Sequence, residues 1–526
     1  MRKEQYSFPT IGDLVKELFN ASGLLARKNT EGRVINESEK KTIQMKLKRL
    51  SDETSKLDDQ LDDLITVFSE LLYDATRDER VVFAVVASLQ DALAQYKDLI
   101  REEGTYLSYS DSVKWLIYSR GLERLVISIS KNQLAYNVSQ SNLTFPLDSN
   151  WWLPKFSENE VIWPIKKVWQ WIYSEIGMSQ RQFHLASEKY SQKQERHLEN
   201  AQRWTSDRQL PSTYAMLECL EDSLSTLKSE RGIDISSNLE NSFRIALVFA
   251  RFSTHAFKMI KKHFGKHFAK SIQKALLVQC NRLRIESSDI LELCDKINEP
   301  AEYIPNTVID NLVFDTVTQY WHKKSGKIIH YSKINQKEII KLSSVGVLPP
   351  RDSIRRIRKA VGGFMLSSVL RQYKIDFKFM PKPEYANLLL KGLGVKKDSS
   401  SLDIIQAYEK EVISENLTPH LGWLVNWSYA NYFYRQEDYS LAYDYYKKSF
   451  ERAKYSAGKN QYLLVNQYIE ICAKNKKYRE FKKGISWASY LGVDVRWLRN
   501  FDDPESEESI SFLYDFFMNV ARYSHL

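Results

Sequence analysis

The most regular pattern in the chain lies in the stretch Ile43-Gln-Met-Lys-Leu47-Lys-Arg-Leu50-Ser-Asp-Glu-Thr54-Ser-Lys-Leu57-Asp-Asp-Gln-Leu61-Asp-Asp-Leu64-Ile-Thr-Val-Phe68-Ser-Glu-Leu71. The numbered residues recur at alternating spacings of four and three, and Thr54 alone among them is polar. This is the 3.5-residue period of packed helices. The pattern restarts after residues 74–78 at Val82, Val86, Leu89, Leu93, Tyr96 and Ile100. It therefore predicts an antiparallel helical hairpin over residues 38–101.

Two arrangements can bury such a hairpin. A dimerising coiled coil is one, and a helical bundle within a single chain is the other. The apolar seams are only about four and three heptads long, and the second helix is apolar on more than one face, which favours the bundle. Upstream, Ile11, Leu14, Val15 and Leu18 predict a short amphipathic helix over residues 10–20, which Gly23 ends.

The composition of the whole chain points to the same fold class. The 526 residues are 43% hydrophobic, which excludes disordered and collagen-like classes. Only 18 Gly and 13 Pro occur, against the ~37 and ~26 of average usage. Turn-forming residues are therefore scarce, and we expect a mainly α-helical, multidomain protein. The expected domains are residues 1–105, 106–235, 236–300, 301–400 and 401–526.

The cysteines and the apolar segments indicate the compartment. Four cysteines lie far apart in the sequence, at positions 219, 280, 294 and 472. They fit neither a metal-binding pair nor a disulfide framework. The N-terminus lacks the apolar core of a signal peptide, and no run reaches ~18 apolar residues. We therefore expect a soluble cytoplasmic protein with no membrane partner.

Positive charge is concentrated in two segments. The chain has 76 Lys and Arg against 66 Asp and Glu, a net charge of +10. Residues 241–285 contain ten Lys or Arg and no acidic residue, and residues 331–400 contain fifteen against five. Each segment alone therefore carries +10, and the rest of the chain is acidic. This segregation indicates an anionic partner.

The first basic segment predicts an amphipathic helix. Its apolar residues, spaced three and four apart, are Phe257, Ile260, Phe264, Phe268 and Ile272. The candidate nucleic-acid contacts on its basic side are Lys258, Lys261, Lys262, Lys266 and Lys270. The alternative is a solvated basic face with no ligand.

The second basic segment contains a pair of predicted helices. A strand is expected at residues 327–331, a helix at 337–345, and a basic helix from Arg351 after Pro349-Pro350. The basic helix carries the candidate contacts Arg351, Arg355, Arg356, Arg358 and Lys359. Residues 337–361 resemble the helix-turn-helix of bacterial transcription regulators, which implies binding to duplex DNA. The alternative is a basic surface that docks an acidic protein or another part of this chain.

Two further predictions concern the middle of the chain. The tryptophans of residues 106–175, among them Trp163 and Trp169, are expected in the core with lysines at its rim. Stacking of such rings on unpaired bases is the alternative. Residues 179–204 are expected to form one polar, solvent-facing helix that includes His184 and His197.

The C-terminal ~100 residues have small and aromatic residues at repeating positions. The first set is Ala430, Phe433, Ala442, Tyr446 and Ser449, and the second, weaker set is Cys472, Tyr478, Phe481, Ile485 and Ala488. These positions resemble those of tetratricopeptide repeats, in which small residues let paired helices approach closely. The resemblance implies stacked helical hairpins that bind a protein partner through residues 420–500.

No motif in the sequence predicts chemistry. We find no phosphate-binding loop, no dinucleotide fingerprint, no HExxH and no kinase motif, and so predict no catalytic residue, no metal ligand and no cofactor. Our hypothesis is a nucleic-acid-binding accessory or regulatory protein, duplex DNA being favoured, that resembles regulators of bacterial operons. The alternatives are a pure protein-interaction scaffold and a nucleic-acid-processing enzyme with a dispersed site.

Overall fold

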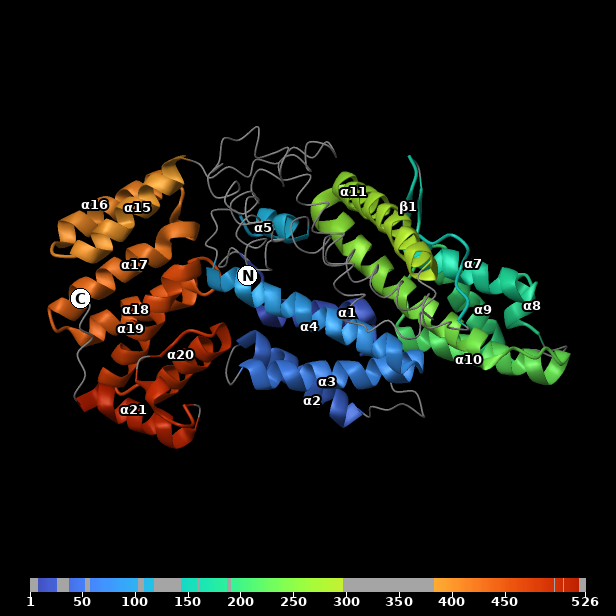
Figure 1. Ribbon diagram of the computed structural model, residues 1–526, viewed down its shortest axis with the longest axis horizontal. Helices are drawn as coiled ribbons and strands as arrows, with labels where there is room; N and C mark the ends of the chain where they lie inside the picture. The colour runs from blue at the N-terminus through green and yellow to red at the C-terminus, as the bar shows by residue number, and fades with distance from the viewer. Residues whose placement is uncertain are drawn as a thin grey trace.

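The computed structural model is almost entirely α-helical (Figure 1). It describes residues 8–25, 37–52, 57–102, 108–117, 143–158, 160–186, 191–296, 383–495, 497–504 and 506–519. Among these residues the only sheet is the antiparallel hairpin of β1 (Lys155–Phe156) and β2 (Val161–Ile162). The mainly α-helical fold expected from the low Gly and Pro content is confirmed.

The helices form three groups. In Figure 1 the C-terminal helices lie at one end, helices α7 to α11 lie at the other, and α1 to α4 lie between them. The helices described before residue 297 are α1 (Ile11–Ser22), α2 (Glu37–Asp52), α3 (Leu57–Thr76), α4 (Glu79–Glu102), α5 (Tyr109–Leu116), α7 (Pro164–Ile176), α8 (Gln180–His184), α9 (Gln192–Thr205), α10 (Thr213–Arg231) and α11 (Ser237–Lys296). The C-terminal elements are α15 (Pro383–Asp398), α16 (Leu402–Ser414), α17 (Thr418–Arg435), α18 (Tyr439–Ala453), η4 (Gly458–Asn460), α19 (Gln461–Lys474), α20 (Tyr478–Leu491), η5 (Leu498–Asn500) and α21 (Glu507–Asn519). None of the helices in the described ranges is both long enough and apolar enough to cross a membrane.

Helix α1 shows how local sequence sets the helix ends. The Thr10 side chain accepts a hydrogen bond from the backbone N–H of Asp13 at 3.0 Å, which satisfies a donor of the first turn. The helix ends at Gly23, whose φ of 65° is the left-handed conformation that glycine adopts without strain. The predicted N-terminal helix and its break at Gly23 are confirmed.

The predicted hairpin is present, but its first helix is divided. α3 and α4 form the antiparallel pair, and α2 folds back on α3, because Lys46 and Asp63 form an ion pair of 2.8 Å. In one straight helix these residues would lie about 25 Å apart at 1.5 Å per residue. The polar run from Ser51 to Ser55 separates the apolar positions of α2 from those of α3, and it is poor in strong helix formers.

The seam residues of this region are buried within the chain. Leu50, Leu64, Phe68 and Leu71 all belong to its largest hydrophobic core. The single-chain bundle is therefore confirmed over the dimerising coiled coil. This core also includes residues of the C-terminal helices, so the two ends of the sequence share one apolar interior.

The end of α4 joins the N-terminal helices to the C-terminal ones. The buried Gln461 side chain donates to the backbone carbonyl of Ile100 at 2.9 Å. The Lys97 ammonium lies 4.8 Å from the centre of the Tyr490 ring. These contacts place α4 against η4 and α20.

Successive C-terminal helices pack on one another, α17 with α18, α18 with α19 and α19 with α20, while α15 and α16 both pack on α17 and α21 lies on α19. Ala430 and Ala442 are fully buried in the tightest pair, α17 and α18. At Gly484, an added Cβ would lie 2.8 Å from the Ile469 side chain, so this position requires glycine for close packing. The burial of small residues accords with the packing that the sequence implies, while membership of the tetratricopeptide family stays a prediction.

Two buried arginines of α11 tie this helix to α1 and α3. Arg244 donates from Nε to the carbonyl of Ala75 at 3.1 Å and from Nη2 to that of Asp74 at 2.8 Å. Arg251 donates from Nε to the carbonyl of Pro211 at 3.1 Å and from Nη1 to that of Asn20 at 2.7 Å. Helix ends leave such carbonyls without partners inside the helix, and a cation there also interacts favourably with the helix dipole.

Both arginines remain charged at neutral pH in spite of burial, which lowers their pKa values to about 10. Arg244 also pairs with Glu221. The backbone of Gly23 lies directly under the Arg251 guanidinium, where a Cβ would clash with Nε. The glycine at this turn therefore serves both the backbone conformation and the approach of the arginine.

We predict that Arg251→Met lowers the thermal midpoint of unfolding. The substitution keeps an apolar stem but leaves backbone carbonyls of α1 without their charged donor, a loss of roughly 3 kcal/mol. Thermal unfolding followed by circular dichroism measures the change. Lys262→Met, at an exposed site on the same helix, is the matched control and should unfold near the wild-type temperature. Equal midpoints for the two variants would contradict the anchoring role of Arg251.

Candidate nucleic-acid interface

The candidate interface lies at a break in α11. Gly265 has φ 88° and ψ 162°, a non-helical conformation within the long helix, and one that is essentially restricted to glycine. Nothing lies within 4 Å of a Cβ built there, so backbone conformation and not space demands this residue. The predicted amphipathic helix is thus two helical segments, and Figure 1 shows the axis of α11 changing direction.

Lysines gather on both sides of this break. Lys258, Lys261 and Lys262 share one face of the segment before it, and Lys266 and Lys270 share one face of the segment after it. Lys262 and Lys266 are exposed and the other three are half-buried. Lys274 continues the second row and is exposed. We call the five predicted residues and Lys274 the lysine face of α11.

Apolar residues on the opposite side fix the orientation of both segments. Phe257, Phe268 and Ile272 are buried, as the amphipathic pattern predicts. Ile260 and Phe264 are half-buried. The apolar side therefore faces the protein, and the lysine face is left at the surface.

The β1–β2 hairpin and the start of α7 lie beside the lysine face. Trp163 is buried and donates from Nε1 to Asp207 at 2.7 Å. The ammonium groups of Lys258 and Lys261 lie 5.5 and 5.8 Å from the centre of its ring. Of the tryptophans expected in the core, Trp163 and Trp169 are buried, whereas Trp151, Trp152 and Trp171 are only half-buried. The buried Trp163 ring lies under the two lysines.

The lysines differ in how much of their charge is available. Lys258 forms an ion pair with Asp207. Lys266 donates to the backbone carbonyl of Glu158 at 2.7 Å, which carries no formal charge. Within the described ranges, no ion pair is formed by Lys261, Lys262, Lys266 or Lys270. Four of the five predicted lysines therefore have no acidic partner among the described residues.

The basic run of α11 is only partly a surface feature. Arg244 and Arg251 belong to the same acid-free stretch, yet both are buried and bind helix ends. Counting every positive residue between 241 and 285 as a phosphate contact would therefore be wrong. Charge counting cannot separate the two roles, because it takes no account of which side of the helix a residue occupies.

The second predicted contact set has no structural description. Arg351, Arg355, Arg356, Arg358 and Lys359 lie outside the described residues. The same is true of the helix-turn-helix-like residues 337–361 and of the strand expected at 327–331. The β element of the described chain lies instead at residues 155–162, between the Leu153-Pro154 and Trp163-Pro164 turn signals.

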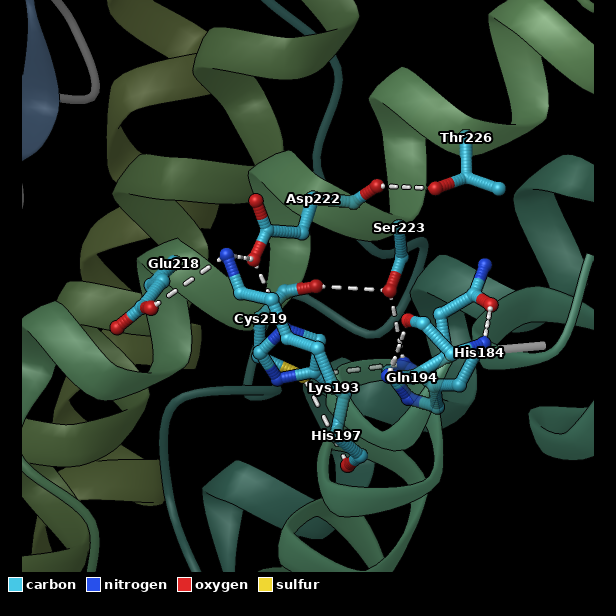
Figure 2. A network of polar contacts seen from close by, with 10 residues as sticks. His184, Lys193, Gln194, His197, Glu218, Cys219, Asp222, Ser223 and Thr226 are labelled. Atoms are coloured by element: carbon cyan, nitrogen blue, oxygen red, sulfur yellow. Dashed lines mark hydrogen bonds and ion pairs between the residues drawn. The ribbon is translucent and has the colours of Figure 1, made fainter.

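A second group of functional side chains surrounds His184 (Figure 2). The expectation of one solvent-facing helix over residues 179–204 is wrong, because the chain forms α8 and α9 there and buries both His184 and His197. Ser179 and Ser191 begin the two helices, each with a Gln three residues later that completes a capping box. That local signal was present in the sequence.

The hydrogen bonds of His184 define its tautomer. Ser223 donates its only hydroxyl proton to the carbonyl of Cys219 at 2.8 Å, so its oxygen must accept from His184 Nδ1 at 2.9 Å. The other ring nitrogen, Nε2, then accepts from the Tyr173 hydroxyl at 2.9 Å. Burial, and to a lesser degree the neighbouring His197, lowers the pKa of His184 to about 3.

Charged side chains lie next to the neutral His184 ring. His197 Nε2 lies 2.8 Å from an Asp222 carboxylate oxygen, and Lys193 Nζ lies 2.6 Å from the same oxygen. The hydrogen bond to Asp222 raises the pKa of Lys193. Burial raises the pKa of the Cys219 thiol well above its ordinary value, so the sulfur is not a thiolate nucleophile.

The network joins helices and does not resemble a catalytic site. Both nitrogens of His184 are occupied by hydroxyl groups, and Ser223 and Cys219 are buried with it. Within the described ranges, no group of three or more His, Cys, Asp or Glu side chains could hold a metal ion. Sequence reasoning missed this network because its partners on α10 are 35 and 39 residues from His184.

We predict that His184 makes stability depend on pH. Its folded pKa of about 3 lies below the ordinary unfolded value near 6.5, so protons bind only the unfolded chain between these values. Stability is therefore lost as the pH falls below 6.5, by at most about 1.4 kcal/mol per pH unit and about 2 kcal/mol between pH 7 and pH 5.

Urea unfolding of the wild type and of His184→Gln at pH 7, 6 and 5 measures this dependence. The variant should be less stable at pH 7, because a less suitable side chain replaces a satisfied one, and should lose less stability on acidification. Other titrating groups are common to both proteins and cancel in the comparison. Parallel loss of stability in the two proteins would contradict the role of His184.

Comparisons of the chain with models of protein families, with curated proteins and with solved structures found no match. The function is therefore inferred from the surfaces of this chain alone.

Proposed function

We propose that this chain binds nucleic acid through the lysine face of α11. The observation that carries the proposal is the group of four lysines without an acidic partner in the described ranges, Lys261, Lys262, Lys266 and Lys270, arranged around Gly265. A surface that neutralises phosphates releases the counterions condensed on them, which supplies most of the affinity of non-specific binding.

Duplex DNA is the favoured ligand. Single-strand binding proteins use exposed aromatic rings on which bases stack. Trp163, over whose ring Lys258 and Lys261 lie, is buried and hydrogen-bonded to Asp207. Ammonium groups bind phosphate as point charges and read little sequence, so we expect contact with the backbone of the duplex and weak sequence preference.

The C-terminal helices supply the second half of the proposal. Consecutive helix pairs between residues 420 and 500 would bind a partner protein in the manner that their resemblance to tetratricopeptide repeats implies. The chain would then be an accessory or regulatory protein that brings a partner to nucleic acid. A cytoplasmic location belongs to this proposal, because Cys219 and Cys472 are buried free thiols, as is usual in a reducing compartment.

A pure interaction scaffold is the alternative that the same lysines allow. An acidic protein surface would also pair with them, although it lacks the regular charge spacing and the condensed counterions of a duplex. Salt dependence distinguishes the two ligands, and so do competition experiments with polyglutamate. No group of side chains in the described ranges favours the enzyme alternative.

We predict a steep salt dependence of binding to a 25-base-pair duplex. The logarithm of the binding constant should fall linearly with the logarithm of salt concentration, with a slope near −0.9 for each phosphate contacted. The triple variant Lys261→Gln, Lys262→Gln, Lys266→Gln should lose affinity, and its slope should be less steep by about 0.9 per lost contact. Fluorescence anisotropy over a salt series measures both.

The matched control removes three positive charges elsewhere. This control is the triple variant Lys41→Gln, Lys48→Gln, Lys410→Gln, which replaces exposed lysines of α2 and α16. It changes the net charge by the same amount as the test variant does. It should bind almost as the wild type does. Equal losses of affinity in the two triple variants would show that net charge, and not the lysine face, determines binding. A wild-type affinity that does not depend on salt, or tighter binding of polyglutamate than of the duplex, would overturn the proposal. Single-stranded DNA and RNA of the same length test the preference for duplex DNA.

A further inference from the structure

The last described helix and the turn before it carry four aromatic rings, of which two are exposed and two are half-buried. On α21, Phe512 and Phe516 lie four residues apart and therefore on the same face. The Phe512 ring pairs with Phe501 and the Phe516 ring pairs with Trp497, each at 5.4 Å between ring centres. The turn η5 joins Trp497 to Phe501 and packs beside α21, so the two ring pairs form a strip along one face of this helix.

This strip lies at the edge of the core, because Phe501 and Phe516 are half-buried against it while Trp497 and Phe512 are exposed. The opposite side of α21 is buried through Ile510, Leu513 and Phe517, which face α19. Trp497 is 50% exposed and Phe512 is 59% exposed. Scattered exposed apolar residues are ordinary on protein surfaces, but a strip of paired aromatic rings is typical of a binding site.

The backbone of Trp497 supports the same interpretation. Its φ of 72° is unusual for a bulky residue, and such conformations cost about 1–3 kcal/mol and persist where the surroundings impose them. Burial of the indole does not explain the conformation, because half of the side chain is exposed. The result of the conformation is an indole held against Phe516 at the surface.

Acidic residues border the strip. Residues 496–519 contain six Asp or Glu and two Arg, and no Lys or Arg occurs between Arg499 and Asn519. Glu508 and Asp515 are exposed on α21 one turn either side of Phe512, and Asp502 and Asp503 are exposed next to Phe501. A segment that covers the rings would therefore place its flanking side chains close to several carboxylates.

We infer that this strip docks a basic amphipathic segment of a partner protein, one whose apolar side chains cover the rings while its Lys or Arg side chains meet the acidic border. The occupant follows from charge complementarity, since like charges next to the rings would repel an acidic segment. The surface lies at the C-terminal edge of residues 420–500, with Trp497 inside that range and α21 beyond it, and it is separate from the lysine face of α11. The inference therefore stands or falls independently of nucleic-acid binding.

The test uses the full chain and a labelled 15-residue peptide of Leu and Lys, with Leu at helical i, i+3, i+4 spacing. We expect the wild type to bind this peptide saturably, as measured by fluorescence anisotropy. The double variant Trp497→Ser, Phe512→Ser should bind it at least tenfold more weakly, because central aromatic contacts supply much of the affinity of an interface. The matched control is Met45→Ser, Phe83→Ser, which changes two exposed apolar residues of α2 and α4 and should leave the affinity unchanged.

A second pair of variants tests the charge. Glu508→Gln, Asp515→Asn should weaken binding and reduce its salt dependence, whereas Asp59→Asn, Asp62→Asn on α3 should not. These substitutions are at exposed positions and keep the side-chain shape, so folding is not at risk. Circular dichroism of every variant checks this.

Three results would overturn the inference. One is equal binding of a Leu and Glu peptide with the same spacing. Another is unchanged affinity for the Leu and Lys peptide in the Trp497→Ser, Phe512→Ser variant. The third is a concentration-dependent dimer in sedimentation that this variant abolishes, since the occupant would then be a second copy of the chain.

Discussion

The position of α11 depends on two guanidinium groups in the interior of the protein. Arg244 and Arg251 bind backbone carbonyls at the ends of α3 and α1, and in doing so they satisfy acceptors that apolar packing alone would leave unpaired. The rest of the helix follows from this attachment. Buried arginine and phenylalanine side chains orient one side of α11 toward the protein. The lysines on its other side therefore lie at the surface, beside the β1–β2 hairpin.

The sequence predicts most of the helical architecture and some of its packing. The seam from Ile43 to Leu71, the break at Gly23 and the burial of Trp163 all follow from periodicity and local turn chemistry. The fold-back of α2 does not, because a regular seam is compatible with one helix or with two. Lys46 and Asp63 reveal the fold-back only through their contact in space. Nor is the break at Gly265 visible, since a single glycine within a helix is ordinary.

The candidate site was predictable where it depends on one helix and unpredictable where it depends on several. Lys258 to Lys270 could be assigned to one surface because helical spacing alone relates them. The environment of His184 could not, because Tyr173 and Ser223 reach it from α7 and α10. A polar segment that buries two histidines has no linear signature beyond its capping residues. Long-range hydrogen bonding therefore decided the features that sequence reasoning missed.

The contact of α4 with the C-terminal helices bears on the order in which the chain is made. The carbonyl of Ile100 is synthesised 361 residues before its partner Gln461, and the side chain of Lys97 is synthesised 393 residues before its partner Tyr490. During translation the N-terminal bundle can fold first and present a finished edge to the helices that emerge last. A fragment that begins at α15 would lack this edge, and the Gln461 amide and the Tyr490 ring would face water. The C-terminal helices can thus pack against N-terminal helices that are synthesised, and can fold, before them.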